Sequence, residues 1–361
     1  MQTRVTLRDV AAKAGVHHTT ASRALKNDPR VCPETLTKIR TIAEEMGYMP
    51  DPMLSALNAY RHASRSAQDH GTIAWITNYP TRDGWRNSSC YMLYFEGASE
   101  RLSKLGYRLE EFWLQEPGMT ARRSSQVLFH RGIRGLLICP LPVSRGHLSL
   151  RWEMFSAVAF GYSLLRPTLH LFSASHYRGL ITCMRKLRAM GYRRIGMVTS
   201  HEMDERMDRM WTAAYRTEIL VALPRNRAFP IYFYSHTEES ASATSKKEYK
   251  KRFMKWFRDY KPDAIVTSSS PVANWLTDEG YDVPGDVAVV SATLQEGEPH
   301  LSGIVEPSRE IGHAAADFVV RMLQHGEYGI PGIPQRILLE GKWFPGKTTG
   351  KGNHSILVSP G

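Results

Sequence analysis

Segments typical of strands and of helices alternate along most of this chain, from residue 70 almost to its C-terminal end. Apolar runs that predict buried strands occupy residues 71–79, 107–114, 135–142, 156–164, 193–200, 229–235, 263–269 and 286–292. Segments with helical patterning occupy residues 90–105, 121–131, 177–190, 205–223, 246–260 and 272–279. Repeated strand–helix units form parallel sheets that helices cover on both faces. We therefore expect an α/β fold, which a break near residues 190–194 divides into two sub-domains.

The first 50 residues follow a different pattern and predict three short helices. The first helix has an apolar face with the spacing i, i+3, i+4, i+7, formed by Leu7, Val10, Ala11 and Ala14. Thr6 precedes it as an N-cap, with Asp9 in the capping-box position, and Gly15 permits a left-handed turn at its end. Helices over residues 18–25 and 33–46 follow. Two helices joined by a glycine turn and covered by a third form a helix-turn-helix.

A helix-turn-helix places its second helix in the major groove of DNA, with the N-terminal residues of that helix towards the base edges. These residues are His18, Thr19, Thr20, Ser22 and Arg23. Arginine can donate to both O6 and N7 of one guanine, and threonine offers a methyl group to thymine or a hydroxyl elsewhere. The residues of this second helix therefore predict that the N-terminal head binds DNA in a sequence-specific manner. The alternative is a small helical bundle with an exposed arginine.

The run LRDVAAKAGVHHTTASRAL, continued by VCPETLTKIRTIAEEMGYMPD, resembles the signature of the lac repressor (LacI/GalR) family of bacterial transcription regulators. The resemblance implies that His18 and Thr19 form the variable base-reading pair and that Arg23 is a more constant base contact. It further implies phosphate contacts from Thr6, Ser22 and Asn27.

Two positions of the head depart from the family pattern. The family usually has serine where His17 stands, and serine or threonine where Cys32 stands. We include His17 among the predicted DNA contacts. His17 and His18 could also be a metal pair, but adjacent residues on a helix point in different directions and no further ligands lie nearby in the sequence.

Residues 51–69 predict a hinge helix and a linker. Asp51 can cap the helix, and Pro52 suits its first position. A helix this short is marginal alone, so we expect it to form only against operator DNA and a partner subunit. The family resemblance implies that Leu57 is a wedge in the minor groove and that Leu54 lies where a small residue is usual. A plain interdomain linker is the alternative.

The order of elements in residues 70–345 resembles the two-lobed periplasmic-binding-protein fold that the family uses as its effector domain. The segments AMGYRRIGMV, KPDAIVTSS, DEGYDVPGDVAVVS and GIVEPSREIGHAAADFVVRML carry this resemblance. Ligands of such folds bind between the lobes, near the carboxyl ends of the strands. We expect the head to span residues 1–50 and a disordered tail to span residues 346–361.

Acids that commonly bind sugar hydroxyls in this family are missing from the predicted cleft. Serine, histidine, threonine or leucine occupies these positions, at Ser175, His176, Ser269, Ser270, Thr293 and Leu294. A hydroxyl replaces a carboxylate acceptor only in part, so a plain sugar effector is disfavoured. A sugar stacked on an aromatic ring and an acidic ligand both remain open. The predicted effector-binding residues are Tyr79, Trp85, Tyr162, His176, Arg206, Trp211, Ser270 and Thr293.

Composition agrees with a DNA-binding protein of the cytoplasm. The four cysteines, Cys32, Cys90, Cys139 and Cys183, are scattered, which argues against a disulfide framework or a zinc site. No apolar run is long enough to span a bilayer, and the N-terminus lacks a signal peptide, so we expect no membrane association and no export. The net charge of +12 suits a polyanionic partner.

We therefore predict a transcription regulator, with repressor as the expected sign, that binds a pseudo-palindromic operator as a homodimer. A small ligand, such as a sugar or a sugar derivative, modulates its affinity for double-stranded DNA. The alternative is an effector-independent regulator whose cleft no longer binds a sugar. Enzymatic activity is not expected, because the motifs G-x-G-x-x-G, H-E-x-x-H and G-x-S-x-G and the P-loop are missing. We expect neither cofactor nor metal, and the lack of a C-terminal leucine heptad favours a dimer over a tetramer.

Overall fold

The computed structural model describes residues 5–25, 31–48, 71–222, 230–234, 243–268, 271–295 and 300–350. Its head consists of α1 (Leu7–Ala14), α2 (His18–Leu25) and α3 (Pro33–Glu45). Gly15 ends α1 with a φ of 71°, in the left-handed region expected of the glycine turn. The three helices bury one small apolar core, in which Val10, Ala21 and Ile39 are fully enclosed. The predicted helix-turn-helix is confirmed. Asn27, Leu54, Leu57, Ser270 and the hinge lie outside the described residues.

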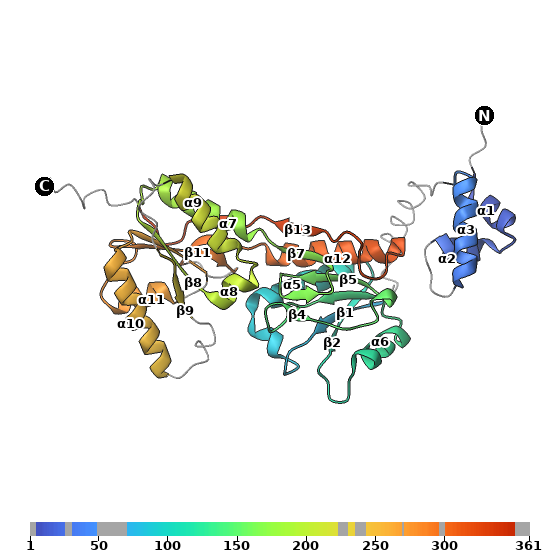
Figure 1. Cartoon of the computed structure of the whole chain (residues 1–361), viewed down its shortest axis with the longest axis horizontal. Coiled ribbons are helices and arrows are strands. Elements are labelled where there is room, and N and C mark those ends of the chain that lie inside the picture. Colours follow the sequence, from blue (N-terminus) through green and yellow to red (C-terminus); the bar gives the residue numbers. More distant parts are fainter. Residues whose placement is uncertain are drawn as a thin grey trace.

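The first lobe of the large domain contains a six-stranded sheet in the order β13-β7-β5-β3-β1-β2. Its strands are parallel: β1 (Thr72–Thr77), β2 (Arg108–Trp113), β3 (Gly135–Ile138), β5 (Ser156–Phe160), β7 (His170–Ala174) and β13 (Arg336–Leu339). Helices α5 (Ser89–Lys104) and α12 (Ser308–His325) cover one face, and α6 (Ala121–His130) covers the other (Figure 1). Short elements β4 (Gly146–His147) and β6 (Leu164–Arg166) pair with each other beside this sheet.

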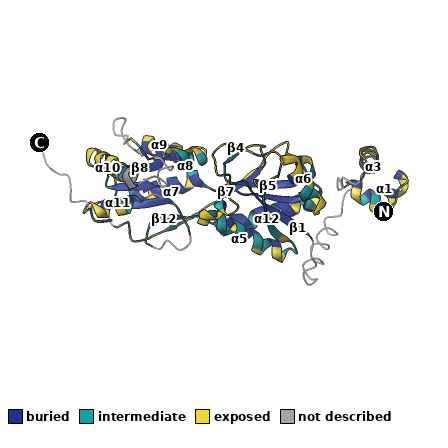
Figure 2. Ribbon diagram, turned by 90° about the horizontal axis from the view of Figure 1, so that it is seen from below, coloured by how far each residue is buried: buried dark blue, intermediate teal, exposed yellow. Residues whose placement is uncertain are grey.

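The second lobe repeats this plan with the strand order β14-β12-β11-β10-β8-β9. Its strands are β8 (Ile195–Ser200), β9 (Tyr232–Tyr234), β10 (Ala264–Thr267), β11 (Ala288–Leu294), β12 (Ser302–Val305) and the antiparallel β14 (Lys342–Phe344). Helices α7 (His176–Ala189), α8 (His201–Arg206) and α9 (Met210–Ala222) precede α10 (Ala243–Tyr260) and α11 (Val272–Asp278). In both lobes the central strands of the sheet are buried, and many exposed residues lie on the outer sides of the helices (Figure 2).

The chain passes between the lobes three times, and the first passage is not where the sequence pattern placed it. The pattern divided the sub-domains near residues 190–194, after the helix. In the structure α7 already packs against α9 and β11 of the second lobe, so the division lies at residues 174–176. The sequence pattern did not reveal this boundary, because a helix with one apolar face, such as α7, can cover the sheet of either lobe. The chain returns between β12 and α12, and crosses a third time between β13 and β14.

Two further predictions are corrected by the structure. The helix expected over residues 205–223 is two helices, α8 and α9, because Asp208 and Arg209 adopt φ values of 54° and 58° and break it. The disordered tail does not begin at residue 346. Thr348 is buried, and its hydroxyl donates to the Val289 carbonyl at 2.6 Å and accepts from the Ser302 amide at 2.9 Å. The chain is therefore ordered through residue 350 by hydrogen bonds to two strands.

Helices α5 and α12 pack closely through two glycines. A Cβ atom on Gly97 would lie 2.1 Å from the carbonyl oxygen of Arg309, and one on Gly312 would lie 2.3 Å from that of Tyr94. Backbone atoms cannot move aside without separating the helices. Ion pairs from Arg309 to Glu96 and Glu100 follow the same contact. The absence of both Cβ atoms therefore sets the distance between the two helices.

We expect Gly312→Ala to destabilise the large domain by about 1–3 kcal/mol, because the added methyl group overpacks the contact of α5 with α12. Gly179→Ala is the matched control in α7, where the nearest atom to a new Cβ is 3.6 Å away. That change should be neutral or stabilise by up to ~1 kcal/mol, the helix-propensity gain of alanine over glycine. Denaturant unfolding of both variants measures the difference, and equal stabilities would contradict the packing argument.

Candidate nucleic-acid interface and interlobe cleft

Helix α2 presents one face to the core of the head and the opposite face to solvent. Ala21 and Ala24 are completely buried, whereas His18, Thr19 and Arg23 are exposed. Thr20 and Ser22 are partly covered, between these two faces. This arrangement follows from the helical period, because residues three and four positions apart share a face. The side chains predicted to read bases are thus free to enter a groove.

His17 immediately precedes α2 and contacts its first turn. Its carbonyl oxygen accepts from the amides of Thr20 and Ala21, at 2.9 and 3.1 Å. Its Nδ1 lies 2.9 Å from the hydroxyl oxygen of Thr19, within hydrogen-bond distance. The ring of His17 also lies against that of His18, with centroids 4.2 Å apart. Histidine at this position therefore orients both residues of the predicted base-reading pair.

The predicted capping box at the start of α1 is confirmed. The Thr6 amide and hydroxyl both donate to Asp9 Oδ2 at 2.7 Å, and the Asp9 amide donates to Thr6 Oγ1 at 3.4 Å. These hydrogen bonds from Thr6 lower the pKa of the Asp9 carboxyl. They hold the N-terminus of α1 in one conformation, and helix N-termini are suited to bind phosphate oxygens.

Cys32 occupies the N-cap of α3 without capping a backbone amide. Its sulfur instead lies 2.9 Å from the Thr35 hydroxyl oxygen. The thiol is exposed, and hydrogen bonding to the Thr35 side chain lowers its pKa. The other three thiols have raised pKa values, because they are buried.

A cavity of about 190 Å³ lies between the lobes. The first lobe contributes residues from α5 and from the carboxyl ends of its strands, among them Tyr91, Tyr94, Tyr162, Ser163 and Ser173. The second lobe contributes Met203, Arg206, Met207, Trp211, Thr293 and Gln295, and the crossing segments contribute His176 and Glu306. The crevice at the carboxyl ends of parallel strands is the usual ligand site of such sheets. Its volume is below that of pockets for drug-sized ligands, about 300–1,000 Å³.

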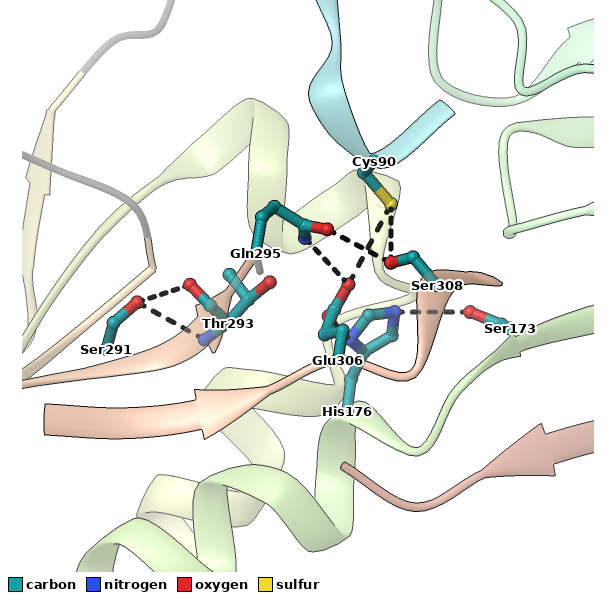
Figure 3. A network of polar contacts seen from close by, with 8 residues as sticks. All are labelled: Cys90, Ser173, His176, Ser291, Thr293, Gln295, Glu306 and Ser308. Carbon is teal, nitrogen blue, oxygen red and sulfur yellow. Dashed lines mark hydrogen bonds and ion pairs between the residues drawn. The ribbon is translucent and has the colours of Figure 1, made fainter. Parts of the chain in front are cut away.

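Glu306 and His176 form a buried polar network at the base of this cavity (Figure 3). His176 Nδ1 lies 3.3 Å from Glu306 Oε1, with both side chains about 5% exposed or less, and His176 Nε2 lies 3.2 Å from Ser173 Oγ. Gln295 donates to Glu306 Oε2 at 3.4 Å and accepts from Ser308 at 3.0 Å. Burial opposes ionisation of Glu306, but the contacts with His176, Thr293 and Gln295 outweigh it and lower the pKa. The pair is therefore a salt bridge when His176 is protonated.

Arg206 extends from the end of α8 across the cleft to the first lobe. Its Nε and Nη2 lie 3.2 and 2.8 Å from the Tyr91 hydroxyl oxygen, and Nη2 also donates to the Leu141 carbonyl. Burial raises the pKa of the Tyr79 hydroxyl, and the nearby Arg206 partly opposes that shift. This one guanidinium thus connects the two lobes. The turn at Asp208 and Arg209 then directs the chain back so that Trp211 also lines the cavity.

Five of the predicted effector residues line the cavity: Tyr162, His176, Arg206, Trp211 and Thr293. Trp85 does not, and this prediction is wrong. Its ring is fully buried against Trp75 at 5.5 Å, and its Nε1 donates to Glu111 at 3.3 Å. Tyr79 lies behind Arg206 rather than in the lining. Ser270 lies outside the described residues.

Glu306, Gln295 and Tyr91 also line the cavity and were not among the predicted residues. The sequence did carry a signal for Glu306, because it directly follows an apolar strand, and the carboxyl ends of parallel strands form the ligand crevice. Among the described residues, no group of three or more His, Cys, Asp or Glu side chains could hold a metal ion. In the same part of the chain, no helix combines the length and the apolar character needed to cross a membrane.

Comparison with known families identifies both parts of the chain. Residues 6–51 match the bacterial regulatory proteins of the lacI family, and residues 184–349 match the periplasmic binding protein-like domain. The chain is 42% identical over 65 residues to the HTH-type transcriptional repressor CytR of Escherichia coli K12. It is 43% identical over 73 residues to the HTH-type transcriptional regulator GntR of Pseudomonas aeruginosa. These matches cover 18% and 20% of this chain, and 18% and 19% of the relatives.

Solved structures resemble the chain over nearly its whole length. The lac repressor dimer bound to operator and the anti-inducer ONPF has a TM-score of 0.54 at 19% identity, covering 96% of this chain and 99% of that one. The complex of the transcriptional regulator CelR with cellobiose has a TM-score of 0.55 at 20% identity, covering 96% and 100%. At these identities the likeness concerns the fold.

We expect an alkylating reagent at mildly alkaline pH to modify Cys32 first. The thiolate is the reactive form, and Cys32 combines exposure with a lowered pKa, whereas burial raises the pKa of Cys90 and Cys183 to about 12. Peptide mass spectrometry over time orders the four thiols. A Cys32→Ala variant is the control, and it should lose the fast phase. Earlier labelling of Cys139 or Cys183 would contradict the described burial.

We expect Glu306→Gln to destabilise the large domain by about 1–3 kcal/mol at neutral pH, since it removes the charged acceptor beside His176. The pKa of Glu306 is lowered from 4.5, so its contribution is present above that pH and is lost as pH falls through the folded value. The melting temperature of the wild type should therefore fall more steeply below pH 4.5 than that of the variant. Glu340→Gln, which breaks an exposed pair with Arg178, is the control and should change stability by less than ~0.5 kcal/mol.

Proposed function

We propose that this chain is a LacI-family DNA-binding transcription regulator with a periplasmic-binding-protein-like domain, and that it represses transcription by binding a pseudo-palindromic operator as a homodimer. The observation that carries this proposal is the exposed face of α2, where His18, Thr19 and Arg23 are free to enter a major groove. Two heads related by a two-fold axis would read two half-sites. Such a repressor works on chromosomal DNA, which places it in the cytoplasm.

The proposed dimer also needs the hinge, whose residues lie outside the described part of the chain. Leu57 is our candidate for an apolar wedge at the operator centre, with Leu54 beside it on the same short segment. Thr6, Ser22 and Asn27 are the proposed phosphate contacts, and His17 supports the reading pair through Thr19. These assignments rest on the order of residues in the head and on its family.

We further propose that a small ligand in the interlobe cavity changes the affinity for the operator. The cavity lies at the carboxyl ends of both sheets and beside the chain crossings, so a bound molecule would touch both lobes and bias the angle between them. The second candidate is a regulator that needs no effector. The contact of Arg206 with Tyr91 favours this alternative, because it joins the lobes without any ligand.

We expect Arg23→Ala to weaken operator binding by about 1–3 kcal/mol and to relax specificity at one base pair of each half-site. Arg23→Lys is the matched variant. It keeps the charge but loses the two-pronged geometry that recognises guanine, so it should retain salt-dependent non-specific binding while losing discrimination. Operator selection from random DNA, followed by titration at two salt concentrations, measures both effects. If both variants discriminated as the wild type does, Arg23 would not be a base contact.

A further inference from the structure

Arg206 is a half-buried cation whose partners in the structure are all neutral. They are the hydroxyl groups of Tyr91 and Tyr79 and the carbonyl oxygen of Leu141. No carboxylate within the described ranges forms an ion pair with this guanidinium. Other partly covered arginines of the same structure do have acids, such as Arg188 with Glu218 and Arg309 with Glu96. A guanidinium gains most from a carboxylate, with which it can form two parallel hydrogen bonds.

Glu306, the one acid among the described residues that line the cavity, does not compensate Arg206. Glu306 is already in contact with His176 and accepts from Gln295. Near Tyr162, the side chains of Asp208 and Arg336 carry opposite charges, and Arg336 Cζ lies 5.4 Å from the centroid of the Tyr162 ring. In the described part of the chain, neither Glu306 nor Asp208 forms an ion pair with Arg206. The guanidinium of Arg206 is therefore the charged group of the described lining that is available to bind an anionic ligand.

A second observation points to a ligand with hydrogen-bond acceptors. Trp211 lines the cavity with its ring fully buried, and its indole Nε1–H has no hydrogen-bond partner among the described residues. A buried donor without an acceptor costs about 1–3 kcal/mol. An oxygen atom of a bound molecule would satisfy it. The hydroxyl groups of Tyr162 and Ser163 in the same lining suit further oxygens.

We propose that the cavity binds a small hydroxy acid with one carboxylate, such as a sugar acid, and that Arg206 is its counter-ion. The inference rests on the proposed function, since it names the ligand class of that same cleft. The carboxylate accepts from Arg206, and a hydroxyl or ring oxygen accepts from Trp211. One uncompensated cation and a volume of about 190 Å³ favour a small monoanion over a phosphorylated sugar, whose second charge would find no partner.

This assignment also gives the ligand a way to act on the lobes. Arg206 belongs to α8 of the second lobe, whereas Tyr91 and Leu141 belong to the first. A carboxylate bound beside Arg206 would replace its hydrogen bonds with the neutral groups of Tyr91 and Leu141 by a charged contact with the ligand. The ligand therefore has a different interaction energy with each arrangement of the lobes, which any shift of a conformational equilibrium requires.

The test is calorimetric titration and thermal melting of the full chain with compounds that share one carbon skeleton. The panel contains glucose, gluconate, glucuronate, glucose 6-phosphate and inorganic phosphate. We expect one of the sugar acids to bind and to raise the melting temperature, with glucose at least about tenfold weaker. Arg206→Gln should weaken the acid by roughly ten- to a hundredfold, the size expected for a lost charge-assisted hydrogen bond. Arg206→Lys should recover part of that loss, and Arg216→Gln, an exposed change on α9, should have no effect.

The outcomes separate this inference from the proposed function. Glucose or glucose 6-phosphate binding as tightly as the acids would overturn the ligand class and leave the regulator intact. Three further results would also overturn the ligand class. They are that no sugar acid binds, that inorganic phosphate raises the melting temperature as much as the sugar acids do, or that Arg206→Gln binds the acid as tightly as the wild type. The melting temperature of the ligand-free variants shows whether they fold. Failure of the wild type to bind any operator selectively would instead refute the proposed function.

Discussion

The arrangement of the two lobes depends on three chain crossings that lie side by side at the buried contact of His176 with Glu306. His176 begins the helix after the first crossing, and Glu306 lies within the second. The third is bonded to the first, since the Ser175 amide donates to the Leu339 carbonyl at 2.8 Å. Any change of the angle between the lobes must bend all three segments together. A buried contact at this point holds the first two segments together, because separating it would leave the buried Glu306 carboxylate without the His176 side chain as its partner.

Much of the fold could be predicted from periodicity, but not all of it. The eight predicted strands correspond to β1, β2, β3, β5, β8, β9, β10 and β11, whereas β7, β12, β13, β14 and the helix α12 were not among the predicted elements. The first crossing was not predicted either, because α7 is amphipathic and its sequence does not say which sheet it covers. The break between α8 and α9 was equally hidden, since Asp208 and Arg209 adopt left-handed backbone without glycine. Such conformations cost about 1–3 kcal/mol each and are held by surrounding contacts, which no local pattern reveals.

The cleft residues were predicted with mixed success, for a related reason. His176 and Thr293, which stand after strands where the family commonly has acids, do line the cavity, because carboxyl ends of parallel strands meet at one edge. Aromatic character was a mixed guide, since Tyr162 and Trp211 line the cavity whereas Trp85 is fully buried in the core. Two tryptophans with the same exposure differ only in which side chains surround them. That information is tertiary and becomes available only when both lobes are folded.

In the described part of the chain, the large domain connects to the head through the first lobe, and a signal from the proposed ligand would take this route. Strand β1 begins at Thr72, beside the edge strand β2 of that sheet, and it is the first element of the large domain that the structure describes after the head. The second lobe has no direct chain connection to the N-terminal residues. Its position matters to DNA only as far as Arg206 and the crossings transmit it to the first lobe. For the proposed signal, the contact of Arg206 with Tyr91 and Leu141 is therefore more decisive than the size of the cavity, because among the described residues it joins the second lobe to the lobe that follows the head.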